Sequence, residues 1–431
     1  MSFRNLAAPL LALLALLDPA ISAAQSDTAE RERLEQRAAD ILAVLQGEKA
    51  QEEVFADSFS AAIPPEQVQA MQQQMEGQMG ALVGIESVEP TGLPGAADLS
   101  LRFEQAIASG PMQLEAAEPY KVSGLRLDRV EPVVTDTRPV LEQLRELPGA
   151  TNLLLARLDG SETVLEHNAD TALALGSSFK LYVLSALVQE VAAGRRAWDE
   201  VVALDTESYP SGILQDWPRG TPLTLQTLAT LMISISDNTA TDQLIATLGR
   251  DVVEAELRAS GHSAPELTLP LLTTREMFLL KTEDDVNLGE YASLGTPERL
   301  AMLQALQQRE VARDRVAQAF GGSPRALDVE WFASPRDIAR IFARLVDDPV
   351  ALGILGINTA IGEEAAASWN YVGFKGGSEP GVLNMSWLLR GSESEWYVLT
   401  LGWNNPDEAV SAPRLLGLAR QALAAVGPAG N

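Results

Sequence analysis

The stretch Leu175–Leu184 constrains this chain more than any other. It predicts a loop that becomes a buried helix at Ser177, because a strongly apolar run follows directly. Lys180 lies one helical turn after Ser177, and residues three apart share a helix face. This spacing can bring the lysine amine within reach of the serine hydroxyl. A lysine placed just ahead of such an apolar run is expected to be partly buried, which is unusual for this residue type.

Two interpretations of this serine–lysine pair are open. A serine hydroxyl needs an adjacent base to act as a nucleophile, and a lysine can be that base once burial or a nearby cation lowers its pKa. The helix N-terminus also offers unpaired N–H groups that suit a developing oxyanion. Alternatively, Ser177 caps the helix and Lys180 is solvated. The pair indicates catalysis only if the rest of the chain supplies matching groups.

The composition of the 431-residue chain narrows the possible chemistry. A net charge of −27 argues against nucleic acid or an anionic membrane surface as partner. Because the chain has no cysteine, disulfides, thiol nucleophiles and cysteine-based metal sites are excluded. Its two histidines, His167 and His262, exclude a zinc site of several histidines and leave two candidate bases for a Ser-His-Asp triad. Both histidines follow turn or loop patterns, so a surface or loop role is the simpler interpretation.

The N-terminal residues predict export. Arg4 precedes an apolar stretch from Leu6 to Leu17, and small residues follow at 22–24, so residues 1–24 are predicted to be a signal peptide. The apolar stretch is too short for a transmembrane helix, so we expect no stable membrane insertion. The mature protein is expected in the periplasm or outside the cell, with an uncleaved anchor as the alternative.

Periodicity divides the rest of the chain into two domains. Residues 26–130 follow the pattern of three helices and four short strands, which predicts an α+β domain. Residues 131–138 combine proline with alternating charges and form the predicted linker. Residues 139–431 form the second predicted domain, in which helices and strands alternate and three strands precede a closing helix.

Two further motifs accompany the serine–lysine pair in the second domain. Ser236–Asn238 (Ser-Asp-Asn) follows an apolar helix, and Lys375–Ser378 (Lys-Gly-Gly-Ser) lies in the first of the three late strands. With these motifs in this order, the chain resembles the penicillin-recognising serine hydrolases, most closely the class A β-lactamases. The resemblance runs from about residue 139 to the C-terminus. It implies an α/β domain of the β-lactamase/transpeptidase-like fold, in which an antiparallel sheet packs with helices. The interval between the second and third motifs is long for the family, so an inserted helical segment is expected near 279–327.

The resemblance implies a catalytic role for three residues. Ser177 would attack the substrate carbonyl, and Lys180 would be its base or part of its proton network. Ser236 would pass a proton to the leaving nitrogen. Acyl transfer independently needs a nucleophile, a base, an acid and fixed oxyanion donors. The counterpart of Asp237 in the family is chiefly structural.

The same resemblance implies a substrate-binding set. Asn238 would donate its side-chain amide to a substrate carbonyl, and Lys375 would attract a substrate carboxylate. Gly377 and Ser378 continue that strand, and the backbone N–H groups of Ser177 and Ser378 would form the oxyanion hole. The expected partner is a small-molecule substrate, a β-lactam, ester or peptide. No metal or cofactor is needed for this chemistry, and the oligomeric state is left open.

Two departures from the family pattern bear on function. The residue after Lys375 is usually threonine or serine, and here it is Gly376. Class A enzymes also hold a deacylating water with a loop glutamate, and the corresponding point of this chain is Leu272. Glu266 and Glu276 flank that point outside the family's Glu-x-x-Leu-Asn pattern. Glu276 is the better candidate for a water-activating base, and a helix-start carboxylate is the alternative.

A narrower group within the family has an extra N-terminal domain and is typified by an accessory protein of clavulanic-acid biosynthesis. The segments 272–278, 330–334 and 374–381 resemble that group. The resemblance implies that residues 26–130 form an NTF2/steroid-isomerase-like cone. Three functions follow as hypotheses: β-lactam hydrolysis first, then an esterase or D,D-peptidase-like hydrolase with weak β-lactamase activity, then a penicillin-binding protein without turnover. Trp217, between the first two motifs, is either a wall of the substrate cleft or a packing residue.

Overall fold

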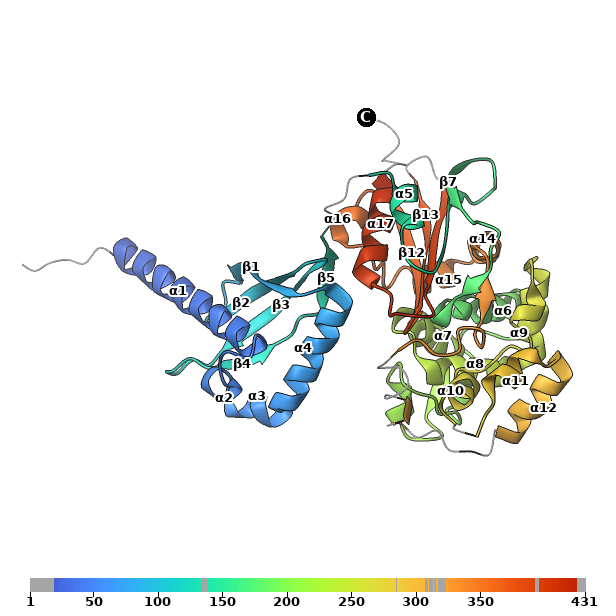
Figure 1. Ribbon diagram of the computed structural model, residues 1–431, viewed down its shortest axis with the longest axis horizontal. Coiled ribbons are helices and arrows are strands. Elements are labelled where there is room, and N and C mark those ends of the chain that lie inside the picture. The colour runs from blue at the N-terminus through green and yellow to red at the C-terminus, as the bar shows by residue number, and fades with distance from the viewer. Residues whose placement is uncertain are drawn as a thin grey trace, which may run out of the picture. The chain divides into compact units, whose positions relative to one another are not determined.

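The computed structural model describes residues 19–133, 138–283, 285–306, 309, 313, 315–316, 323–391 and 395–424, without the side chains of residues 19–28, 132, 363 and 364. The chain divides into two compact units, residues 1–133 and residues 134–431. Figure 1 shows both. Most of the predicted signal peptide, residues 1–18, lies outside the described residues.

The first unit combines helices with an antiparallel sheet. The sheet has the order β1-β2-β3-β4, and β5 pairs with β3. Its core lies between α1 and the sheet, around Leu34, Ile41, Leu99 and Phe103. The elements are α1 (Pro19–Leu45), α2 (Gln51–Val54), α3 (Asp57–Ala62), α4 (Pro65–Met79), β1 (Leu82–Pro90), β2 (Ala96–Phe103), β3 (Ala106–Leu114), β4 (Val122–Leu125) and β5 (Arg129–Pro132).

The first unit departs from the sequence prediction in two places. The single helix expected near 52–62 is two helices, because Phe55 turns into the core and Ala56 N donates to Val122 O at 2.9 Å. Strand β5 occupies the start of the predicted linker, because Val130 pairs with Ala108 of β3. The helices-then-strands order matches the predicted α+β class, while the likeness to a steroid-isomerase-like cone stays a prediction.

The second unit is built on an antiparallel sheet with the order β12-β13-β14-β6-β7. Its strands are β6 (Ala150–Arg157), β7 (Thr163–His167), β12 (Tyr371–Glu379), β13 (Val382–Arg390) and β14 (Trp396–Asn404). Helices α5 (Val140–Arg145) and α17 (Ala412–Ala424) pack on one face, with Leu144, Trp387 and Leu415 in the core between them. The three late strands and the closing helix therefore lie where the sequence predicts them, and the antiparallel sheet is confirmed.

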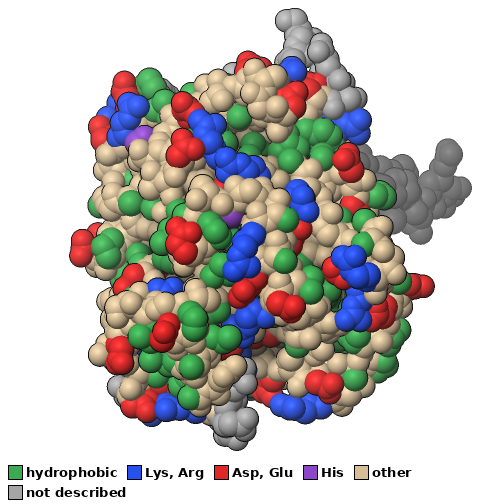
Figure 2. Space-filling view, turned by 90° about the vertical axis from the view of Figure 1, so that its right-hand side faces the viewer, with side chains coloured by type: hydrophobic (Ala, Val, Ile, Leu, Met, Phe, Trp, Pro, Cys, Tyr) green, Lys and Arg blue, Asp and Glu red, His purple; other side chains and the backbone are tan. Residues whose placement is uncertain are grey.

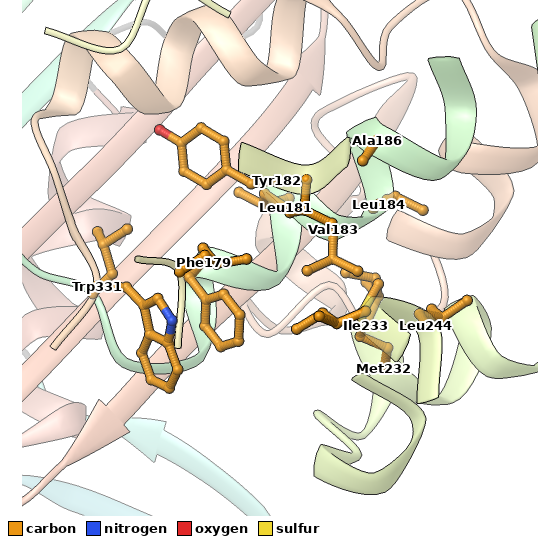
Figure 3. Close-up of a cluster of buried hydrophobic side chains, with 14 of the residues drawn as sticks. Phe179, Leu181, Tyr182, Val183, Leu184, Ala186, Met232, Ile233, Leu244 and Trp331 are labelled. Atoms are coloured by element: carbon orange, nitrogen blue, oxygen red, sulfur yellow. The ribbon is translucent and has the colours of Figure 1, made fainter. Parts of the chain in front are cut away.

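The other face of this sheet carries the larger, helical half (Figure 1). Its central helix, α6 (Lys180–Ala192), is buried along residues 180–188. Figure 3 shows its apolar side chains packed toward Met232, Ile233 and Leu244. The surrounding helices are α7 (Leu225–Ser234), α8 (Asn238–Leu248), α9 (Arg250–Ala259), α10 (Thr274–Thr282), α11 (Leu288–Ser293), α12 (Thr296–Leu306), α14 (Pro335–Ala343) and α15 (Pro349–Leu355). The short helix α16 (Glu363–Ala366) packs with the core on the opposite face.

Helices α10, α11 and α12 fall in or overlap the predicted helical insertion near 279–327, part of which lies outside the described residues. Helices α9 and α15 are not anticipated by the sequence prediction. No helix in the described ranges is both long and apolar enough to span a membrane. On the face drawn in Figure 2, acidic and basic side chains are interspersed, so the net negative charge is not gathered there into one patch.

Candidate active site

Ser177 lies in a short 3-10 helix, Gly176–Phe179, between strand β8 (Leu173–Ala174) and α6. Two contacts to Trp331 hold this turn. Leu175 N donates to Trp331 O at 2.9 Å, and the rings of Phe179 and Trp331 stack with centroids 3.8 Å apart. Figure 3 shows the two rings face to face. The predicted transition from loop to buried helix at Ser177 is confirmed, and its first turn is a 3-10 helix.

Strand β12 passes so close to Ser177 that two glycines are required. A Cβ added to Gly377 would lie 2.4 Å from Ser177 N and 2.1 Å from Leu175 O. Gly176 has a φ of +51°, and a Cβ there would lie 2.9 Å from Ser378 N. Because real Cβ contacts are longer, only glycine fits at both positions. This approach brings Gly377 against the amide of Ser177, and Gly176 against the amide of Ser378.

The amine of Lys180 is fully buried and points to the second motif. Its Nζ lies 2.7 Å from Ser236 O, 3.2 Å from Ser236 Oγ and 2.7 Å from Asn238 Oδ1. Burial and the neighbouring charge of Lys375 hold the pKa of Lys180 well below its usual range, although Asp242 and Asp237 oppose the shift. A neutral amine has a lone pair, so Lys180 can accept a proton. No hydrogen bond joins Lys180 to the Ser177 hydroxyl, and catalytic hydrogen bonds are often long before substrate binds.

Ser236 has a positive φ of 58° and is followed by a carboxylate that fixes the turn. Asp237 is the N-cap of α8, and its Oδ1 accepts from Ala240 N at 2.8 Å. Its Oδ2 accepts from Ile213 N at 2.7 Å and from Leu214 N at 3.0 Å. A strained serine is thus held by local hydrogen bonds, which is common at functional sites. The geometry agrees with the structural role expected for Asp237.

Asn238 uses both ends of its amide. Its Oδ1 accepts from Lys180, and its Nδ2 donates to Tyr209 O at 2.9 Å. An amide nitrogen carries two donors, so one remains for a substrate carbonyl. Tyr209 lies in the loop between the first two motifs, where the sequence prediction singled out Trp217 instead. Trp217 is 42% exposed, which leaves both interpretations of that residue open.

Lys375 reaches the same serine from strand β12. Its Nζ donates to Ser236 Oγ at 3.2 Å and also to the carbonyl of Gly376. Burial lowers the pKa of Lys375 to about 7, so the amine changes charge near neutral pH. Two lysines from distant parts of the sequence therefore converge on one hydroxyl. Ser236 can pass protons between groups with lowered pKa values.

The glycine after Lys375 has a packing explanation. A Cβ at Gly376 would lie 2.7 Å from Cζ of Phe374. The Phe374 ring leans over this position and packs against Trp387, with centroids 5.0 Å apart. An aromatic ring therefore covers the place where the family's hydroxyl side chain would stand. This is the physical counterpart of the departure seen in the sequence.

Glu276, the candidate deacylating base, is occupied by other partners. It completes a capping box at the start of α10, where its Oε2 accepts from Thr273 N at 2.9 Å. Its Oε1 accepts from Arg250 Nη2 at 2.6 Å, and the residue is 4% exposed. Such contacts are those of a helix-start carboxylate. Glu276 also lines a cavity of about 790 Å³. The lining residues of this cavity include none of Ser177, Lys180, Ser236 and Lys375.

The segment before Glu276 is apolar and buried. Leu269, Leu271 and Leu272 are each at most 5% exposed. Leu272 O accepts from Trp331 Nε1 at 3.0 Å, which fixes the segment beside the Ser177 turn. Leu272, where the family pattern would place a carboxylate, therefore offers an aliphatic side chain. Glu266, the weaker candidate, is exposed and lies in a short 3-10 helix, Pro265–Leu267.

The two histidines are engaged elsewhere. His262 Nε2 lies 2.8 Å from Phe332 O, and its Nδ1 accepts from Ala264 N at 3.1 Å. His167 Nε2 lies 3.2 Å from Thr151 Oγ1. Neither ring is hydrogen-bonded to Ser177. His262 lies in a loop, as expected from the sequence, and is buried there.

Comparisons with known proteins found a family model and similar solved structures. Residues 139–351 match a family model described as "Beta-lactamase enzyme family". No curated protein matches the chain. Similar solved structures include a β-lactamase from Sphaerobacter thermophilus, which is 22% identical over 66% of this chain and 93% of that chain, with a TM-score of 0.46.

Two further solved structures are similar at lower identity. PBP-A is 19% identical over 67% of this chain and 92% of that chain, with a TM-score of 0.44. A β-lactamase from Chitinophaga pinensis is 16% identical over 68% of this chain and 98% of that chain, with a TM-score of 0.45. The family match confirms the predicted resemblance of the second unit to the β-lactamase family over residues 139–351. It covers the first two motifs and ends before Lys375.

Proposed function

We propose that the second unit is a serine hydrolase that forms a covalent acyl-enzyme at Ser177 with β-lactams and with esters. The observation that carries this proposal is the convergence of Lys180 and Lys375 on Ser236 Oγ, each at 3.2 Å. A single buried lysine can be structural, but two lysines of lowered pKa on one hydroxyl form a proton-transfer group. The close approach of Gly377 to Ser177 N adds the oxyanion donors.

The proposed acylation follows from these contacts. Ser177 Oγ attacks the carbonyl carbon, and its proton passes to the neutral Lys180 amine. The carbonyl oxygen becomes an oxyanion between the N–H groups of Ser177 and Ser378. Ser236 donates its proton to the leaving nitrogen or oxygen and is reprotonated from Lys180. The bond between the carbonyl carbon and the leaving group then breaks, and the acyl group stays on Ser177.

Substrate recognition in this proposal uses the remaining groups. The free N–H of Asn238 binds an amide carbonyl of the acyl side chain, and Lys375 in its charged form attracts a substrate carboxylate. A β-lactam with a side-chain amide and a carboxylate meets both requirements. Hydrolysis of β-lactams is therefore the first candidate function.

A second candidate is favoured by the contacts of Glu276. Its two carboxylate oxygens are held by Thr273 N and Arg250, and Leu272 takes the position expected for a base. A β-lactam adduct would then be hydrolysed slowly, because its leaving group stays tethered and no carboxylate activates water. Esters release their leaving group on acylation, so an esterase with weak β-lactamase activity is the alternative. A penicillin-binding protein, which would form the adduct without hydrolysing it, is the third candidate.

The deciding experiment is time-resolved intact-mass spectrometry of the protein mixed with a penicillin, a cephalosporin and a p-nitrophenyl ester. We expect an adduct on Ser177 with all three. A short-lived β-lactam adduct with product accumulating would assign a β-lactamase. A long-lived β-lactam adduct together with turnover of the ester would assign the esterase, and long-lived adducts with all three compounds would assign a penicillin-binding protein without turnover. Absence of any adduct at Ser177 would overturn the proposal.

We further propose that residues 1–24 are removed on export to the periplasm or beyond, and that the first unit is a steroid-isomerase-like accessory domain. The export proposal rests on the sequence pattern alone. N-terminal sequencing of the protein recovered from a secreting bacterial host tests it. A mature N-terminus upstream of residue 24, or retention in the cytoplasm, would contradict it.

A further inference from the structure

A buried cluster of three charged side chains lies beside the candidate oxyanion hole. Lys281 Nζ donates to Glu379 Oε1 at 2.6 Å and to Glu330 Oε1 at 3.2 Å. The side chains of Lys281, Glu330 and Glu379 are 1%, 0% and 6% exposed. They come from three separate segments: helix α10, the loop before strand β11 (Phe332–Ala333), and the end of β12. We call this cluster the Lys281 triad.

The Lys281 triad is electrostatically costly. Two carboxylates share one ammonium, and burial together with the charge of Glu330 raises the pKa of Glu379 well above its usual range. Glu379 Oε2 is buried and has no hydrogen-bond partner among the residues that the structure describes. Replacing buried ion pairs by apolar side chains is often neutral or stabilising. Stability alone is therefore a weak reason for this arrangement.

Glu379 connects the Lys281 triad to β12, the strand that carries the Ser378 amide. Glu379 directly follows Ser378 in β12, and alternate residues of a strand point to the same side. Lys375, Gly377 and Glu379 thus share one face of β12. Lys375 reaches Ser236, Gly377 lies against Ser177 N, and Glu379 is anchored by Lys281. The anchor holds the strand end that carries the Ser378 amide.

Glu330 connects the Lys281 triad to the turn that holds Ser177. Glu330 Oε2 accepts from Trp331 N at 3.2 Å. Trp331 in turn accepts from Leu175 N and stacks on Phe179, so it contacts residues on both sides of Ser177. Lys281 therefore joins the segment that fixes the Ser177 amide to the strand that carries the Ser378 amide.

We propose that Lys281, Glu330 and Glu379 are positioning residues that hold the amides of Ser177 and Ser378 at the relative position that the oxyanion needs. They do not touch the substrate. The oxyanion forms only on the way to the acyl-enzyme, so displacement of either amide lowers the acylation rate and leaves ground-state binding unchanged. This inference rests on the proposed function of Ser177.

The test compares Glu379→Gln, which keeps the size of the side chain and cannot ionise, with the wild-type chain. Acylation of Ser177 by a p-nitrophenyl ester is followed before the steady state by product release and intact mass. We expect the acylation rate constant to fall about 10- to 100-fold while the dissociation constant of the ester stays nearly constant, since a misplacement of about 1 Å can cost about 10²-fold. Binding of a phenylboronic acid, whose tetrahedral adduct needs the same two donors, should weaken in parallel.

Glu256→Gln is the matched control. Glu256 is also 6% exposed and is paired with a single arginine, Arg344, in the same unit. Its replacement should lower the melting temperature without changing the acylation rate constant or the boronate affinity. If Glu256→Gln and Glu379→Gln lower the acylation rate constant equally, the effect is a general loss of stability and the inference is wrong.

The outcomes separate this inference from the proposed function. A wild-type chain that is never acylated at Ser177 would overturn both. A wild-type chain that is acylated, with Glu379→Gln acylated at the same rate, would overturn the triad alone. If Glu379→Gln does not fold, Glu379→Asp withdraws the carboxylate from Lys281 by one methylene while keeping its charge. A smaller fall in the acylation rate constant is then expected, and an unchanged acylation rate constant would contradict the inference.

Discussion

Two regions beside Ser177 are built in opposite ways. Around Ser236, two amines of lowered pKa and a strained serine converge within hydrogen-bond distance. In the segment 269–276, three buried leucines precede a glutamate whose oxygens are held by a backbone amide and by Arg250. The first region is polar and assembled for proton transfer. The second is apolar, and its one buried carboxylate stabilises a helix start.

The contrast teaches that the two halves of an acyl-transfer reaction depend on separate parts of one fold. Forming an acyl-enzyme needs the groups gathered at Ser236, whereas hydrolysing it needs an activated water. The contacts of this chain supply the first need better than the second. The predictions below test each side, beginning with the change that should matter most.

The largest effect is expected from Ser177→Ala. Removing the nucleophile should lower hydrolysis of any ester or β-lactam by about 10⁴-fold or more, because the other groups act through it. Ser178→Ala is the matched control, since the buried Ser178 hydroxyl has no hydrogen-bond partner among the described residues and its loss should be nearly neutral. Initial rates and adduct mass measure both variants. Full activity of Ser177→Ala would show that Ser177 is not the nucleophile. The comparison between the Ser236 region and the segment 269–276 would then have no bearing on acyl transfer.

A smaller loss is expected from Lys180→Met. General-base catalysis contributes about 10²- to 10⁴-fold, so acylation should slow by a factor in this range. Methionine fills a similar volume, and a fully buried lysine contributes little stability, so the melting temperature should not fall. Pre-steady-state acylation and calorimetry give the two readouts. Unchanged acylation would show that Lys180 is structural and that Ser236 finds its proton elsewhere.

The pH dependence of kcat/KM should report the charge of Lys375. Lys375 has a pKa of about 7, so its positive charge is lost as the pH rises through 7. The kcat/KM for a carboxylate-bearing substrate should fall on that side by about tenfold per pH unit, while the value for a neutral ester should not. Profiles from mildly acidic to mildly alkaline pH test this. In Lys375→Arg, whose charge persists, the two substrates should show the same profile.

The motifs were predictable because each depends on local sequence. An apolar run after Ser177, a capping Asp237 and a glycine-rich strand at Lys375 each leave a mark within a few residues. Their order along the chain then predicted that they meet, and the contacts of Lys180 and Lys375 bring them together at Ser236. The burial of α6 followed from the apolar run after Ser177.

Other features depend on contacts between distant segments and could not be predicted in this way. The second half of strand β5, residues 131 and 132, was assigned to the linker, because these residues have no pattern of their own and become a strand by pairing with β3. Lys281 resembled a solvated lysine on a charged helix, since its two partners lie far along the chain. Glu276 was open between two roles until its partner Arg250 was known.

The smallest kinetic effect is expected from Glu276→Gln. The substitution weakens the capping box and leaves Arg250 without its carboxylate, so the free energy of unfolding should fall by about 1–3 kcal/mol. The lifetime of the acyl-enzyme should not change, because both oxygens already have structural partners. Denaturant unfolding and adduct decay measure the two quantities, with the exposed Glu266→Gln as a control that alters neither. An acyl-enzyme lifetime about tenfold longer in Glu276→Gln would identify Glu276 as the water-activating base and give the apolar region its own role in turnover.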